Sequence, residues 1–131
     1  MAKKFNGIDW LVWILLSIGA INFGLALLGI NIVLYFAQGL GAKIIYGIIG
    51  ASAVYSIWSI ATKRLGKMSV IQSSAIWILI FSGLNWLLAI WSVNLVTMVL
   101  PIVILQNIIY GLVGIAGIYS VYFLIQQAKK A

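Results

Sequence analysis

The stretch "IIYGIIGASAVYSI" at residues 44–57 is nearly repeated as "IIYGLVGIAGIYSV" at residues 108–121. A shift of 64 positions places identical isoleucines, tyrosines, glycines and a serine over one another, and a shift of 63 aligns a second series upstream. That series consists of Asn22 over Asn85, Leu25 over Leu88, Ala26 over Ala89, Asn31 over Asn94 and Val33 over Val96. Because asparagine, tyrosine and glycine recur in step, the sequence predicts a tandem repeat, with copies at about residues 8–62 and 70–126.

The composition indicates an integral membrane protein. Hydrophobic residues make up 65% of the 131 residues and charged residues 7%, whereas a soluble surface needs roughly a quarter of its residues charged. Since about 20 apolar residues cross the hydrocarbon core, the chain has room for four spans in a single membrane domain, residues 1–131. The predicted fold is an all-α bundle whose four transmembrane helices cover residues 10–28, 43–61, 70–93 and 100–125.

Two spans in each copy return the chain to the side on which it began. Both copies then have the same topology, and a pseudo-two-fold axis runs along the membrane normal. The basic residues follow the positive-inside pattern, with Lys43 alone on the far side. The others fall on one side of the four-span arrangement: Lys3, Lys4, Lys63, Arg64, Lys67, Lys129 and Lys130.

This asymmetry predicts a multi-pass protein of the inner, cytoplasmic membrane, with both termini cytoplasmic. Lys63, Arg64 and Lys67 lie in a short polar loop between the second and third spans. We expect them to contact anionic lipid headgroups on the cytoplasmic side rather than nucleic acid.

Ordinary catalysis is not expected. The chain contains no cysteine and no histidine, and Asp9 is its only acidic residue, so thiolate nucleophiles, paired carboxylates and carboxylate metal cages are excluded by count. We therefore predict no enzyme activity, no cofactor and no metal site. Asp9 precedes the first apolar run, where a carboxylate caps the free N–H groups of a helix.

Polar side chains inside the apolar helices need hydrogen-bond partners, because an unpaired amide in hydrocarbon costs several kcal/mol. From helical rise, Asn22 is predicted to meet the residues around 52–56, and Asn85 those around Tyr119. Such residues form either a structural clasp between helices or the lining of a conduction path. The set comprises Asn22, Tyr55, Ser56, Asn85, Tyr119 and Ser120.

Glycines three and four residues apart leave a strip without side chains on the second and fourth spans. Small residues allow helix backbones to approach closely, so we expect a packing surface, the alternative being room for a substrate or water. The strip contains Gly47, Gly50, Gly111, Gly114 and Gly117, and Gly19 and Gly24 are candidates to continue it.

The segments that follow Asn31 and Asn94 are too apolar for solvated loops and too short to cross the membrane. They read "GINIVLYFAQGLGA" (29–42) and "VNLVTMVLPIVILQ" (93–106), and both fall on the same side. They are expected to be interfacial, re-entrant, or contacts between subunits.

The half-repeats "SIGAINFGLALLGINIV" and "IFSGLNWLLAIWSVNLV", each followed by its copy of the opening phrase, resemble the YuzA-like family of small uncharacterised bacterial membrane proteins. The resemblance covers nearly the whole chain as two copies. Phe23 stands where that family usually has tryptophan, Leu87 where it has glycine, and Asn31 and Asn94 where it often has aspartate. The family implies a fold and supplies no activity.

Two classes of function remain open. The first is a structural or accessory membrane protein that associates with itself or with another membrane protein. The alternative is a small channel or transporter for an ion or a small uncharged solute, with a path lined by Asn, Tyr and Ser, and a holin-like lesion former is a third option.

Overall fold

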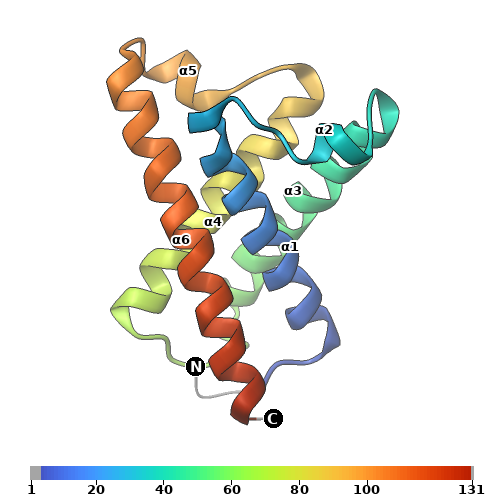
Figure 1. Cartoon of the computed structure of the whole chain (residues 1–131). Coiled ribbons are helices and arrows are strands. Elements are labelled where there is room, and N and C mark those ends of the chain that lie inside the picture. Colours follow the sequence, from blue (N-terminus) through green and yellow to red (C-terminus); the bar gives the residue numbers. More distant parts are fainter. Residues whose placement is uncertain (1–3, 131) are drawn as a thin grey trace.

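The computed structural model describes residues 4–130, and within that range the chain is helical with no strand (Figure 1). Lys3, part of the basic pattern, lies outside the described residues. The elements in chain order are α1 Gly7–Gly24, η1 Leu25–Leu28, α2 Val33–Phe36, α3 Leu40–Ala61, α4 Val70–Leu88, η2 Ala89–Trp91, α5 Leu95–Val99 and α6 Val103–Lys130.

Four helices are long and apolar enough to cross a membrane, which confirms the predicted number of candidate spans. They are Gly7–Leu28, Leu40–Ala61, Val70–Trp91 and Val103–Lys130. The first two begin three residues earlier than predicted. The fourth begins after Pro101, whose ring disfavours helical backbone at the preceding residue, Leu100 (φ −110°, ψ 100°), and it continues to Lys130 rather than ending at residue 125.

The bundle has two distinct ends (Figure 1). At the terminal end, as we call it, lie the start of α1, the turn of residues 62–69 and the last residues of α6. At the opposite end lie the two short helices α2 and α5 with their connecting segments.

Side chains determine where α1 and α4 begin. The amide of Asn6 accepts a hydrogen bond from the backbone of Asp9, and the Asp9 carboxylate accepts one from the backbone of Asn6. This reciprocal capping box confirms the predicted capping role of Asp9. Ser69 and Gln72 form a second capping box at the start of α4.

Helix α3 ends in a turn with a left-handed residue. The N–H of Lys63 donates to the carbonyl of Ile60, and the N–H of Arg64 donates to the carbonyl of Ser59, which is the Schellman arrangement of a helix C-terminus. The residue in the left-handed conformation is Lys63, with φ 55°, at a position where glycine is usual.

The helix pairs with the most extensive packing are α1 with α6 and α3 with α4. Helices α1 and α4 also contact each other, and each of them contacts all three other long helices. A fully buried cluster of mainly apolar side chains, which also includes the serines Ser17, Ser82 and Ser120, fills the space between the helices. It contains Leu16, Ala20, Ala53, Ile76 and Leu79.

Close backbone approach occurs at some of the predicted glycines. A Cβ atom on Gly117 would lie 2.9 Å from the backbone nitrogen of Ile21, and one on Gly24 would lie 2.7 Å from the Cα of Gly114. On the other side of the bundle, a Cβ on Gly50 would lie 2.5 Å from the Cβ of Leu87. These distances leave no room for a methyl group, so glycine sets the spacing of both helix pairs.

Gly47 and Gly111 differ from the rest of the predicted strip. An added Cβ would meet a side-chain atom at 3.6 Å and 3.7 Å respectively, which is ordinary van der Waals contact. Their positions therefore leave room for a methyl group.

Candidate functional site

A network of side-chain amides joins α1 to α3 at the opposite end. The Nδ2 group of Asn22 donates to Oδ1 of Asn31 (2.9 Å), and Nδ2 of Asn31 donates to the phenol oxygen of Tyr46 (2.9 Å). The Oδ1 atom of Asn22 accepts from the backbone N–H of Ile32 (2.7 Å). The buried amide of Asn22 thus ties the connecting segment before α2 to the bundle.

The same arrangement joins α4 to α6. Asn85 Nδ2 donates to Asn94 Oδ1 (3.2 Å), Asn94 Nδ2 donates to the phenol oxygen of Tyr110 (2.9 Å), and the N–H of Leu95 donates to Asn85 Oδ1 (2.7 Å). We call these two networks the Asn–Asn–Tyr clasps. Each one satisfies a buried asparagine and holds an apolar connecting segment against the helices.

The predicted partners of Asn22 and Asn85 are wrong. The hydrogen bonds of both amides go to the connecting segments, whereas Ser52 and Ser56 donate to carbonyls of their own helix, at 3.0 Å and 2.9 Å. The reason is depth in the bundle. Helices α1 and α3 start before the assumed positions, so Asn22 lies nearer the opposite end and Tyr55 nearer the terminal end.

The equivalent residues of α6 are also separate from Asn85. Ser120 is fully buried, and its hydroxyl lies 2.7 Å from that of Ser17 on α1. The half-buried Tyr119 has its ring 6.3 Å from that of Tyr122. The structure therefore does not bring the six residues predicted for the clasp or path together as one cluster.

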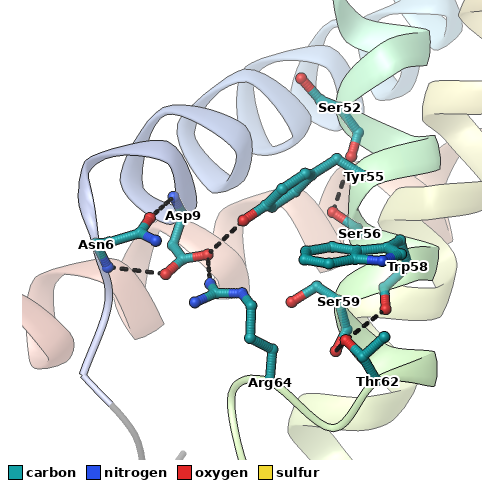
Figure 2. Close-up of polar contacts among 9 residues, drawn as sticks. All are labelled: Asn6, Asp9, Ser52, Tyr55, Ser56, Trp58, Ser59, Thr62 and Arg64. Atoms are coloured by element: carbon teal, nitrogen blue, oxygen red, sulfur yellow. Dashed lines mark hydrogen bonds and ion pairs between the residues drawn. The ribbon is translucent and has the colours of Figure 1, made fainter.

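A second polar cluster lies at the terminal end and is centred on Asp9 (Figure 2). Asp9 is 1% exposed, and its carboxylate forms an ion pair with the guanidinium of Arg64. The phenol of Tyr55 donates to the same carboxylate oxygen at 3.3 Å. The hydrogen bond to Asp9 is the main reason that the pKa of Arg64 is raised above its usual range.

Sequence reasoning missed this ion pair and assigned Arg64 to lipid headgroups. A usable signal was present, because a buried carboxylate needs a cationic partner. Asp9 is the only acid in the chain, and Arg64 belongs to the basic loop that returns to the same end.

A cavity of about 440 Å³ opens beside the Asp9 cluster. Most of its wall is apolar and comes from α1, the last turns of α3, the connecting turn and α4. Its polar members are Asp9, Tyr55, Ser56, Ser59, Lys63 and Lys67.

Two polar atoms near this cavity have no hydrogen-bond partner in the described part of the chain. They are the hydroxyl of Ser59 and Nε of Arg64. Ser59 is 3% exposed, and Figure 2 shows it on the side of α3 that faces the Arg64 guanidinium. Within residues 4–130 no cluster of histidine, cysteine or acidic side chains could hold a metal ion.

Comparison with known proteins finds a family model that matches part of the chain. A family model described as a domain of unknown function (DUF378) matches residues 69–125, close to the range predicted for the second copy of the repeat. This agrees with the expectation of an uncharacterised family of small proteins. No curated protein and no solved structure matches the chain.

Proposed function

We propose that this chain is a structural or accessory membrane protein without catalytic activity, which acts by associating with copies of itself or with another membrane protein. The observation that carries the proposal is that the polar groups of the two ends are separated by a mostly apolar core, in which the buried hydroxyls of Ser17, Ser82 and Ser120 hydrogen-bond within the protein. The Asn–Asn–Tyr clasps lie at the opposite end and the Asp9 cluster at the terminal end. Leu16 and Leu79, both with no exposed surface, lie in the bundle core.

A channel with an Asn, Tyr and Ser lining is less well supported. Such a path requires polar groups that follow one another through the bundle. Here Asn22 and Asn85 use their amides to hold the connecting segments, and Ser120 is paired with Ser17. These residues are engaged in contacts within the protein.

The proposal includes a tandem duplication in which the two copies exchange helices. Helix α1 of the first copy packs on α6 of the second, and α3 of the first packs on α4 of the second. Equivalent residues make equivalent contacts, since Gly114 meets Gly24 and Gly50 meets Leu87. This crossed arrangement supports a pseudo-two-fold relation with the same topology in both copies.

In the proposed orientation both termini and the basic turn of residues 62–69 face the cytoplasm, and the protein resides in the inner membrane. The apolar segments at α2 and α5 then share the external side. Tyr35 and Phe36 on α2 are 75% and 85% exposed. Together with Met98 and Val99 on the α5 side, these side chains offer a surface for self-association.

Reconstitution tests the proposal most directly. We expect vesicles containing the purified protein to release trapped potassium, chloride and glycerol no faster than empty vesicles, while chemical cross-linking at low protein-to-lipid ratio captures oligomers. A Phe36→Ser variant should reduce cross-linking, and the matched Ile125→Ser variant on α6 should not. Solute release that is abolished by Asn22→Leu without loss of thermal stability would establish the channel in place of the structural role.

A further inference from the structure

We propose that the cavity beside Asp9 binds the phosphate group of an anionic membrane phospholipid. The cavity is lined by residues of α1, the last turns of α3, the basic turn and α4. The start of α1 and the basic turn lie at the terminal end, where the membrane-spanning helices stop (Figure 1). This is the depth of the lipid headgroups in the proposed orientation.

The charges around the cavity favour an anion. Lys63 and Lys67 line the cavity with two positive charges and Asp9 lines it with one negative charge. Arg64, which is paired with Asp9, contributes a third positive charge beside the cavity. The Asp9 carboxylate already accepts hydrogen bonds from the backbone of Asn6, from Tyr55 and from Arg64. Two lysines at the rim therefore remain in excess, and an ammonium group is a suitable partner for phosphate.

The unpaired hydroxyl of Ser59 also favours a bound phosphate, independently of the charges. A buried hydroxyl without a partner is unfavourable, and Ser59 lines the same cavity as both lysines. A phosphate oxygen bound there would accept a hydrogen bond from this hydroxyl. The buried Nε of Arg64 is a further donor in the same region.

The apolar wall identifies the source of the phosphate. Val12, Trp13, Ile60, Leu65 and Ile76 line the cavity below the polar rim. A free phosphate ion has no group that benefits from such a wall, whereas the glycerol and first acyl carbons of a phospholipid do. The combination of a cationic rim and an apolar interior fits an anionic amphiphile.

Two substitutions separate binding from folding. Ser59→Ala removes an unsatisfied hydroxyl, so the unliganded protein should keep its melting temperature while affinity falls roughly tenfold. Lys63→Gly removes the ammonium group and suits the left-handed backbone at that position, so it should lower affinity about fivefold without weakening the helix end. Lys43→Gln is the matched control, because it removes one charge from an exposed lysine near the opposite end.

In the experiment, the full-length protein in a neutral detergent is titrated separately with didecanoyl phosphatidylglycerol, didecanoyl phosphatidylcholine and inorganic phosphate. Binding is measured by the adducts retained in native mass spectrometry and by the change in melting temperature. We expect saturable binding of phosphatidylglycerol that Ser59→Ala and Lys63→Gly weaken and Lys43→Gln does not. Equal binding of phosphatidylcholine, or equal loss of affinity in Lys43→Gln, would show non-specific lipid adsorption and overturn the proposal. Stabilisation by inorganic phosphate without binding of phosphatidylglycerol would identify a free-anion site and overturn the proposed lipid site. No binding of any probe would also refute the proposal.

Discussion

The indole of Trp86 on α4 stacks on the phenol ring of Tyr46 on α3, with ring centroids 5.0 Å apart and planes inclined by 15°. The indole N–H donates to the carbonyl of Gly19 on α1 at 2.8 Å. One residue of the second half therefore contacts both long helices of the first half. Phe23 is the residue of the first half that aligns with Trp86, and its ring lies 5.2 Å from that of Tyr110 in the second half.

The Asn–Asn–Tyr clasps should contribute similarly to stability. Replacing Asn22 or Asn85 by Leu leaves the backbone N–H of Ile32 or Leu95 without a partner and removes the side-chain hydrogen bond to Asn31 or Asn94. We expect each variant to lose about 1–2 kcal/mol of unfolding free energy. Reversible unfolding in mixed detergent micelles measures the loss.

Gln38→Leu, which changes an exposed amide at the same end, is the control for the clasp variants. Its stability should stay within about 0.5 kcal/mol of the parent. If Asn22→Leu and Gln38→Leu behave alike, the clasp makes no measurable contribution.

Glycines on one helix should respond differently to the same methyl group. Gly117→Ala forces a Cβ to 2.9 Å from a backbone nitrogen of α1 and should destabilise the bundle by about 1–3 kcal/mol. Gly111→Ala has 3.7 Å of clearance and should be neutral or stabilising by up to about 1 kcal/mol through helix propensity. Equal effects in the two variants, measured by thermal unfolding in detergent, would contradict close packing at Gly117.

The ion pair between Asp9 and Arg64 should be coupled energetically. Arg64→Leu leaves a buried carboxylate without its cation, and because Arg64 is partly exposed we expect a cost of about 1–3 kcal/mol. Adding Asp9→Asn in the same chain should recover part of that loss. A double-mutant cycle with no coupling would exclude a contribution of the pair to stability.

The pH dependence of this pair has a defined sign. The pKa of Arg64 is raised in the folded protein. The stabilisation of the folded state by Arg64 is therefore fully present below the ordinary guanidinium pKa, and it is lost only as pH rises through the higher pKa of the folded protein. The stability difference between the parent and Arg64→Leu should not change through titration of Arg64 between about pH 6 and about pH 9. Parallel melting curves across that range test this expectation.

The orientation in the membrane can be tested without background, because the chain has no cysteine. A cysteine in place of Ser69 should react with an impermeant maleimide only from the cytoplasmic side. A cysteine in place of the exposed Gln38 should react only from outside. Labelling of the Ser69 position in intact cells would reverse the proposed orientation.

Sequence reasoning located the helices well because uninterrupted apolar runs mark candidate spans. It failed on the hydrogen-bond partners of Asn22, since partners depend on where a helix begins, and α1 and α3 each begin three residues before the predicted position. The aligned pairs Asn22 with Asn31 and Asn85 with Asn94, each nine residues apart, contained the correct answer. In the sequence analysis the alignment of these asparagines supported only the prediction of a repeat.

The ion pair and the cavity were harder to anticipate. Arg64 and Asp9 are 55 positions apart, and no periodic pattern relates a loop residue to a helix start. The unpaired Ser59 hydroxyl depends on side-chain packing around the turn of residues 62–69. Sequence alone does not specify that packing.

The packing of α1 against α6 also has a consequence for biosynthesis. These helices stand at the two ends of the chain, so their contact closes the longest loop in the bundle and is expected to form late. During translation α1 can meet α3 and the basic turn long before α6 emerges. The ion pair of Asp9 with Arg64 can then hold the first hairpin together at its terminal end before α6 is made and packs against α1 at Gly24.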